Sequence, residues 1–221
     1  MMRPQEKTAI QAGRLLSQAK KLMAIYSPFG KEEKAQDYLQ GLLERSGLKV
    51  RRQPVSRQRH NLIVEPENGE AELVLMGHVD TVAAHDLDQM DIHEEGGRIF
   101  GLGSADMKGG LAAMVEAFCV ARSLRGPDLP AALAIVVGEE DEGDGAEKFI
   151  SEYSIPWALI GEPTRLKVCP ANFGYVEVHV IAQGERLHAS LADLSSSPVS
   201  AILDALQRLV LFAEGEHPDW S

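Results

Sequence analysis

The sequence predicts an α/β fold in which a mostly parallel sheet is covered by helices on both faces. Apolar runs at residues 73–76, 131–137 and 157–160 are continuous rather than alternating, which is typical of strands buried on both faces. Segments with helical spacing separate these runs, and strands that alternate with helices favour parallel pairing. Shorter strands are expected at residues 48–55 and 61–65.

The helical segments are recognised by apolar residues three and four positions apart. One helix is expected over residues 6–26, before a Ser-Pro-Phe-Gly segment that breaks it. A second is expected over residues 35–43 and is stopped by Gly47. The third covers residues 109–124, and its apolar stripe consists of Leu111, Met114, Val115, Phe118 and Cys119.

The pattern changes after residue 165. Residues 175–180 alternate strictly, as in a half-exposed strand. Ser197 and Pro198 are the residue types of a helix cap and a first helical position, and an apolar helical face follows them. We therefore expect two domains, at residues 1–166 and 167–221, of which the second is the start of a small α+β domain.

The charge balance argues against a nucleic-acid or anionic-membrane binder. The chain has 22 Lys and Arg against 33 Asp and Glu, a net charge of −11, and phosphate binding depends on clustered basic residues. Its two cysteines are too few for a disulfide scaffold. The polar start of the sequence does not resemble a signal peptide, and no apolar stretch approaches the roughly 20 residues that span a bilayer. We expect a cytoplasmic protein.

The three apolar runs end in the same way, with a glycine followed by a histidine or a carboxylate. The first run leads to His78 and Asp80, the second to Glu139 and Glu140, and the third to Glu162. Open α/β sheets carry their sites at the carboxyl ends of the strands. His78 and Asp80 would point to one side of an extended strand, whereas Glu139 and Glu140 would point to opposite sides.

A glycine-rich segment at residues 101–110 opens the third helix. It does not fit the dinucleotide-binding pattern, because Asp106 stands where the third glycine is needed. It does not fit a phosphate-binding loop either, because Lys108 is followed by glycine rather than serine or threonine. What remains is an acidic residue held at the start of a helix.

Each feature alone has a simpler interpretation. A single His-x-Asp is more often a surface or cap pair, a run of acids at residues 139–142 is more often a solvated loop, and Asp106 could be an ordinary helix cap. Together they are harder to dismiss, because carboxylates gathered at one sheet edge repel each other unless a cation neutralises them.

Four motifs, in this order and at these separations, resemble the dinuclear-zinc exopeptidases and amidohydrolases. That family includes acetylornithine deacetylase, succinyl-diaminopimelate desuccinylase, aminoacylase and glutamate carboxypeptidase. The resemblance extends over about residues 21–211. The motifs are Gly-His-Val-Asp-Thr-Val at 77–82, Gly-Ser-Ala-Asp-Met-Lys-Gly-Gly at 103–110, Gly-Glu-Glu-Asp-Glu-Gly at 138–143 and Gly-Glu-Pro-Thr at 161–164.

The resemblance implies two Zn²⁺ ions per active site, with cobalt or manganese as substitutes. It also implies a cis peptide bond between Asp106 and Met107. The implied roles are His78 and Glu162 as ligands of the first metal, Glu140 as a ligand of the second, Asp106 as the bridge between them, Asp80 as the residue that orients His78, and Glu139 as the general base.

The segment after residue 183 resembles the start of this family's lid and dimerisation domain. There, His188 would reach into the active site of a partner subunit and stabilise the oxyanion, which implies a homodimer formed through the lid. The chain departs from the family in one respect. A further histidine expected on the second metal, far downstream, has no counterpart before Ser221.

The function implied is zinc-dependent hydrolysis of the amide bond of an N-acyl amino acid, as in a deacetylase or desuccinylase. A dipeptidase or carboxypeptidase acting on a short peptide is the alternative within the family. The non-catalytic alternative is an inactive fragment that lacks the downstream metal ligand. A nucleotide-binding protein is disfavoured by Asp106, by Lys108 and by the acidic balance.

Overall fold

The computed structural model describes residues 9–85, 91–171, 174, 178–184 and 197–215. The chain divides into two compact units, Met1–Val168 and Cys169–Ser221. This division lies close to the boundary expected after residue 166. The assignment of the second unit to a lid or dimerisation domain stays a prediction.

The first unit is built on a five-stranded sheet with the order β1-β2-β6-β3-β7. Strand β3 pairs in parallel with β6 and β7, whereas β2 pairs antiparallel with β1 and β6. Only β2 therefore runs against the other strands, which confirms the mostly parallel sheet. The strands are β1 (Arg51–Pro54), β2 (His60–Val64), β3 (Leu73–His78), β6 (Ala131–Val136) and β7 (Trp157–Ile160).

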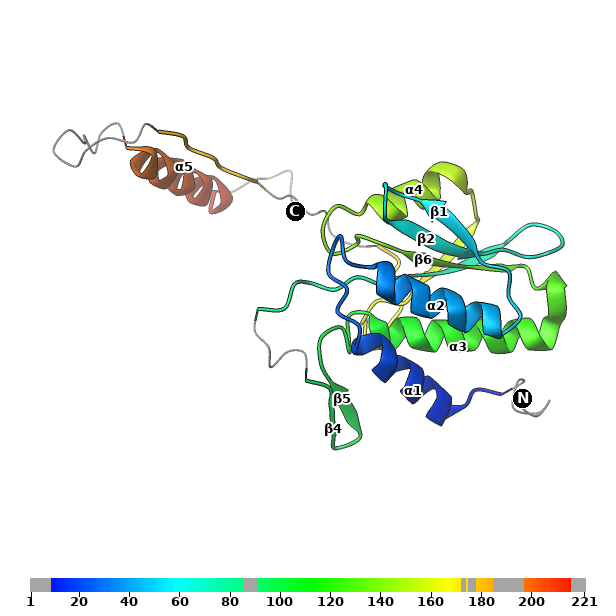
Figure 1. Ribbon diagram of the computed structural model, residues 1–221. Coiled ribbons are helices and arrows are strands. Elements are labelled where there is room, and N and C mark those ends of the chain that lie inside the picture. Colours follow the sequence, from blue (N-terminus) through cyan, green and yellow to red (C-terminus); the bar gives the residue numbers. More distant parts are fainter. Residues whose placement is uncertain (1–8, 86–90, 172–173, 175–177, 185–196, 216–221) are drawn as a thin grey trace. The chain divides into compact units, whose positions relative to one another are not determined.

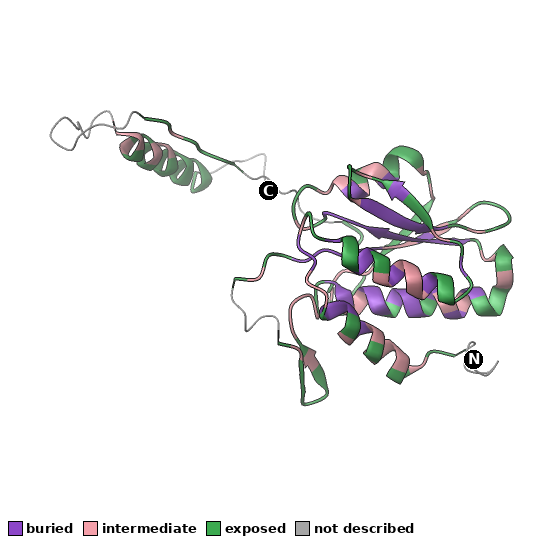
Figure 2. Cartoon of the chain, in the orientation of Figure 1, coloured by how far each residue is buried: buried purple, intermediate pink, exposed green. Residues whose placement is uncertain are grey.

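Helices cover both faces of this sheet, as the sequence predicts (Figure 1). Helices α1 (Ala12–Met23), α2 (Glu33–Arg45) and α3 (Lys108–Arg125) lie on one face, and α4 (Asp144–Glu152) lies on the other. The layers are held by a core in which every residue of β6 is buried (Figure 2).

Strand β6 divides its side chains between the two layers, because successive residues of a strand point to opposite faces. Leu133 and Ile135 belong to the cluster that packs against α1, α2 and α3. Ala132 and Ala134 belong to the cluster beneath α4, where they lie with Phe149. The apolar run at residues 131–137 is continuous for this reason.

Strand β7 differs from the expectation of strands buried on both faces. It lies at the edge of the sheet, and Trp157, Leu159 and Ile160 are 74%, 54% and 55% exposed. Its principal contact is with the neighbouring strand β3. Its apolar side chains are therefore left open to solvent.

Several elements differ from the sequence prediction. Helix α1 begins at Ala12 rather than near residue 6, and β1 begins at Arg51. The nine-residue helix α4 was not predicted. Neither was the hairpin of β4 (His93–Glu95) and β5 (Arg98–Phe100), although its Gly96-Gly97 turn, with both φ angles positive, is a recognised hairpin signal.

In the second unit, α5 (Pro198–Ala213) begins where the sequence predicts. The Ser197 hydroxyl accepts a hydrogen bond from the Val199 N–H at 3.2 Å, which confirms Ser197 as the cap. The expected strand is not confirmed, since residues 178–180 are not in a strand and 175–177 lie outside the described residues. Across the described residues, no helix has the length and apolar character needed to cross a membrane.

Two leucines of α3 give a direct test of this packing. Leu111 is 0% exposed in the core, whereas Leu124, on the same helix, is 61% exposed. We expect Leu111→Ala to lower the free energy of unfolding by about 2–5 kcal/mol, because it leaves a cavity. Leu124→Ala should change it by less than about 0.5 kcal/mol. Urea unfolding of both variants measures the difference, and equal losses would contradict this core.

Candidate metal centre

The three strand ends that the sequence singles out lie at one edge of the sheet. Strand β3 ends at His78 between its two parallel neighbours, β6 and β7. Glu139 and Glu140 follow β6, and Glu162 follows β7. Because parallel strands present their carboxyl ends at the same edge, the side chains converge. Donor atoms of His78, Asp106 and Glu140 lie within 4.8 Å of one another, as do those of His78, Glu139 and Glu162.

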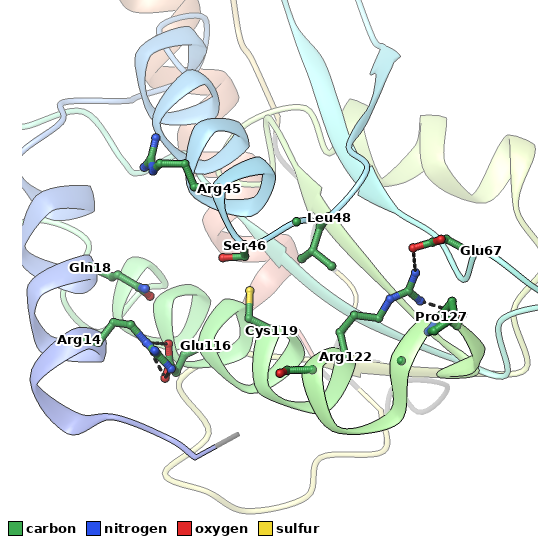
Figure 3. Close-up of a pocket in the computed structure, with 13 residues that line it drawn as sticks. Arg14, Gln18, Arg45, Ser46, Leu48, Glu67, Glu116, Cys119, Arg122 and Pro127 are labelled. Atoms are coloured by element: carbon green, nitrogen blue, oxygen red, sulfur yellow. Dashed lines mark hydrogen bonds and ion pairs between the residues drawn. The ribbon is translucent and has the colours of Figure 1, made fainter. Parts of the chain in front are cut away.

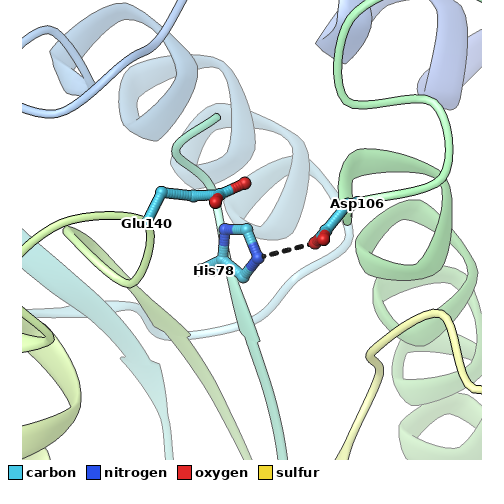
Figure 4. Close-up of side chains that lie close together, drawn as sticks. All are labelled: His78, Asp106 and Glu140. Atoms are coloured by element: carbon cyan, nitrogen blue, oxygen red, sulfur yellow. Dashed lines mark hydrogen bonds and ion pairs between the residues drawn. The ribbon is translucent and has the colours of Figure 1, made fainter. Parts of the chain in front are cut away.

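His78 is buried. Figure 4 shows its ring close to the carboxylates of Asp106 and Glu140. Its Nε2 lies 3.1 Å from Asp106 Oδ1, 3.6 Å from Glu139 Oε2 and 3.7 Å from Glu162 Oε1. Its Nδ1 lies 3.0 Å from the carbonyl oxygen of Asp80. One ring nitrogen therefore faces three carboxylates while the other faces the protein.

Asp80 connects His78 to the segment that carries Glu140. Its Oδ1 lies 3.6 Å from His78 Nδ1, and its Oδ2 accepts a hydrogen bond from the Glu140 N–H at 3.0 Å. Burial of Asp80 acts to raise its pKa, but the His78 ring and the Glu140 N–H lower the pKa below its ordinary value. Asp80 is therefore an anion that lies next to His78 Nδ1 and accepts a hydrogen bond from the Glu140 backbone.

Glu139 and Glu140 do not lie on a strand, which corrects the expectation that they point to opposite sides. Strand β6 ends at Val136, and the next residues form a turn closed by a 2.7 Å hydrogen bond from the Gly143 N–H to the Gly138 carbonyl oxygen. Gly138 has a φ of 74°, which ends the extended backbone. In this turn both carboxylates reach the neighbourhood of His78.

Asp106 lies in the loop that precedes α3, and the peptide bond between Asp106 and Met107 is cis, as the resemblance implies. The two glycines that follow allow the loop to come close to its neighbours. A Cβ atom at Gly110 would lie 2.5 Å from the Gly161 carbonyl oxygen, so α3 begins almost in contact with the exit of β7.

Lys108 is a feature whose role the sequence did not reveal. It is 1% exposed, and its Nζ donates a hydrogen bond to the Ile25 carbonyl oxygen at 2.5 Å. Burial lowers its pKa to about 8, and the charge of Asp80 opposes this change. The signal was present in the sequence as a lysine at the start of an otherwise apolar helix.

The electrostatics of the site are those of crowded carboxylates. Burial and the charges of Asp106 and Glu139 raise the pKa of Glu162 to about 7, although His78 acts in the opposite direction. Burial acts to lower the pKa of His78, but Asp80, Glu139 and Glu162 outweigh it and raise the pKa to about 9. With no metal ion bound, protons on His78 and Glu162 offset part of the negative charge of the surrounding carboxylates.

The spacing of these donors fits a metal centre. Zinc binds nitrogen and oxygen at about 2.1 Å, so neighbouring ligand atoms of a tetrahedral site lie about 3.4 Å apart. The three separations from His78 Nε2, at 3.1, 3.6 and 3.7 Å, are close to that value. One imidazole with several carboxylates is also a donor set that zinc accepts. His188, expected to act in a partner's site, lies outside the described residues.

A hollow of about 520 Å³ opens beside Asp106 and Glu140. Part of its wall is the β4–β5 hairpin, where the rings of His93 and Phe100 stack with centroids 5.0 Å apart. The sequence did not predict this wall, because only the folded chain brings the hairpin next to Asp106 and Glu140.

A second hollow, of about 320 Å³, lies along α3 away from these residues (Figure 3). Four of its charged groups form two pairs. Arg14 donates to Glu116 at 2.8 and 3.0 Å, and Arg122 donates to Glu67 at 2.7 Å. The first pair joins α1 to α3, and the second joins α3 to the segment between β2 and β3, so we assign no chemistry to this hollow.

Comparison with known proteins identifies the family of this chain. The family described as peptidase family M20/M25/M40 matches residues 74–218. The chain belongs to this family. The matched region begins within β3 and includes all the acidic residues that surround His78, so the M20/M25/M40 match and the metal centre rest on the same part of the chain.

Two relatives show how far the similarity extends. A probable carboxypeptidase of Aspergillus clavatus is 32% identical over 217 residues, which cover 90% of this chain and 48% of the relative. A probable succinyl-diaminopimelate desuccinylase of Staphylococcus epidermidis is 30% identical over 182 residues, which cover 78% and 45%. The chain spans about half the length of the curated relatives it matches.

Solved structures support the α/β architecture. A tripeptidase from Staphylococcus aureus matches with a TM-score of 0.56 at 27% identity, over 68% of this chain and 43% of that one. An M20 family metallo-carboxypeptidase from Sulfolobus solfataricus matches with a TM-score of 0.53 at 17% identity, over 66% and 37%. The second shows the shared fold alone.

The raised pKa values predict how pH affects the metal-free protein. Between pH 6.5 and about 8 the folded state binds more protons than the unfolded state at His78, and up to about pH 7 it does so at Glu162. Stability should therefore fall as the pH rises through this range. The lowered pKa values of His60 and Lys108 act mainly below and above it, respectively.

Thermal unfolding in the presence of a chelator, measured at pH 6.5, 7.2 and 8, tests this electrostatic picture. The melting temperature should decrease across the series, and saturating Zn²⁺ should raise it most at pH 8. The control is Glu162→Gln, which should reduce the decrease. A metal-free melting temperature that rises with pH would contradict the picture.

Proposed function

We propose that this protein is a zinc-dependent hydrolase that cleaves the amide bond of an N-acyl amino acid. The observation that carries the proposal is the convergence of His78, Asp106, Glu139, Glu140 and Glu162 at one sheet edge with the spacing of metal ligands. Membership of a peptidase family supports hydrolysis, and relatives named as carboxypeptidase and as desuccinylase support a substrate with an amide bond.

His78 and Glu162 would hold a first metal ion, Glu140 a second, and Asp106 would lie between them. Zinc bound in such sites polarises a carbonyl group and lowers the pKa of coordinated water towards about 7. Asp80 would keep the His78 ring in one orientation, because it contacts the ring nitrogen that faces away from the carboxylates. A carboxylate behind a liganding histidine also increases the basicity of the ring.

Glu139 would act as the general base. Its side chain is 49% exposed at the edge of the site, so it can meet both water and substrate. It would accept a proton from the attacking water and deliver it to the leaving amine, so that an amide and water become a carboxylate and an amine. His188 would stabilise the oxyanion from a partner subunit. This last role, the homodimer formed through the second unit and the cytoplasmic location stay predictions.

Two substitutions separate the proposed base from the proposed ligands. Glu139→Gln should abolish amide hydrolysis but leave the zinc content unchanged, because it removes the proton acceptor and keeps the shape of the side chain. His78→Ala should lower the zinc content, because it removes the central donor. Elemental zinc per chain and hydrolysis rates are the measurements. Retained turnover in Glu139→Gln would exclude Glu139 as the base.

The matched control is Glu142→Gln, which alters an exposed carboxylate of the same acidic segment. It should change neither the zinc content nor the rate. A wild-type zinc content near two per chain would support the dinuclear site. A content near one or zero, without turnover, would instead favour the inactive-fragment alternative.

A substrate panel distinguishes the deacylase from the peptidase alternative. N-acetyl and N-succinyl amino acids would be compared with dipeptides that contain the same carboxyl-terminal residue. We expect kcat/KM at least tenfold higher for one of the N-acyl amino acids. A higher kcat/KM for the dipeptides would overturn the choice of substrate but not the hydrolase.

A further inference from the structure

The segment that carries Glu139 and Glu140 is held by side chains from the other side of β6. We name residues 138–143 the acidic turn. Arg59 directly precedes β2, and its guanidinium donates two hydrogen bonds to Asp144, the first residue of α4, one of them from Nη2 to Oδ1 at 3.0 Å. Its Nε donates to Glu32 Oε1 at 2.9 Å. The Arg59 side chain is only 11% exposed.

The start of the acidic turn is shaped to admit this arginine. A Cβ atom at Gly138 would collide with Arg59 Nη2 and with Asp144 Oδ1. The guanidinium also stacks on the Phe29 ring, whose centroid lies 4.1 Å from Arg59 Cζ. Arg59 is therefore fixed by charge, by hydrogen-bond direction and by stacking, which is a combination that lysine cannot reproduce.

A second side chain, two residues along, connects the segments on either side of the turn. Asn61 is fully buried in β2. Its Oδ1 accepts a hydrogen bond from the Val137 N–H at 3.2 Å, just before the turn, and its Nδ2 donates to the Gly145 carbonyl oxygen at 2.8 Å, just after it. Gln53 Oε1 accepts the other Nδ2 hydrogen at 2.8 Å and so sets the orientation of the amide.

Arg59 and Asn61 thus hold both ends of the acidic turn, and neither is among the candidate metal ligands. Between these ends, the turn is closed by the hydrogen bond from Gly143 to Gly138, and Glu140 is held by Asp80. The positions of the Glu139 and Glu140 backbones relative to His78 are therefore set from β2 and α4 as well as from β3.

We propose that Arg59 and Asn61 are positioning residues for the metal centre, which act through Asp144 and the ends of the acidic turn to hold Glu139 and Glu140 at ligand distance from His78. This inference rests on the proposed metal site. It assigns to the β1–β2 hairpin a part in that site, although the hairpin carries no candidate ligand.

Cobalt(II) is the probe that tests this inference, because its visible absorption reports ligand geometry and its titration reports affinity. Arg59→Met retains an unbranched side chain and removes the guanidinium, which carries every hydrogen-bond donor and the contact with Phe29. We expect it to weaken Co²⁺ binding by about 10- to 100-fold, the range usual for residues that support metal ligands, and to shift the visible bands. Arg59→Lys should recover only part of the affinity.

The matched control is Arg52→Met. Arg52 lies on β1 and also pairs with a carboxylate, Asp37 at 2.8 Å, but its side chain is 49% exposed and does not contact the acidic turn. It should bind Co²⁺ as the wild type does. Asp144→Asn provides the second variant, with a smaller loss expected. Combined with Arg59→Met it should add little, because both remove the same contact.

The outcomes separate this inference from the proposed function. Wild-type chain that binds no Co²⁺ would overturn both. Wild-type binding with unchanged affinity and spectrum in a folded Arg59→Met would overturn the positioning role alone, even if that variant melts at a lower temperature. Should Arg59→Met not fold by circular dichroism, Asp144→Asn decides in its place, and unchanged affinity and spectrum in that variant would overturn the positioning role.

Discussion

The parallel register of three strands is the constraint on which the rest of this structure depends. His78 lies opposite Val136 of β6, and Met76 lies opposite Ile160 of β7. Because the strands run in the same direction and end at nearly the same level, the residues that follow each of them emerge at one edge. A register shift of one residue would turn His78 to the other face of the sheet.

Close approach of the loops to this edge requires small residues at the strand ends. A Cβ atom at Gly77 would lie 2.5 Å from the Met107 methyl group, and one at Gly161 would lie 2.9 Å from it. The Met107 side chain therefore fills the space that these two glycines leave. This packing brings the start of α3, and with it Asp106, against the ends of β3 and β7.

The same convergence creates an electrostatic problem that shapes the surrounding segments. Burial and the charges of Asp106 and Glu139 raise the pKa of Glu162 to about 7, against the opposing effect of His78. Hydrogen bonds to the segments that carry these carboxylates stabilise the compact arrangement. Asp80 holds Glu140, Lys108 reaches the Ile25 carbonyl, and Arg59 holds Asp144. A bound cation would then complete a site whose ligands are already in place, which lowers the cost of ordering them.

Local sequence patterns predict the three apolar strands, the helix α3 between the first two of them and the acidic residues that follow the strands. These are local patterns, and a strand that ends in Gly-His-x-Asp can be recognised without knowing its neighbours. Which of the carboxylates face His78 depends on the fold. Glu139 and Glu140 were expected on opposite sides of a strand, yet a glycine with positive φ places them in a turn.

The roles of Arg59 and Asn61 could not be predicted from local sequence patterns. Their hydrogen-bond partners, Asp144 and Val137, are 85 and 76 residues away along the chain. The exposure of β7 could not be predicted either, since a run of apolar residues does not distinguish a central strand from an edge strand.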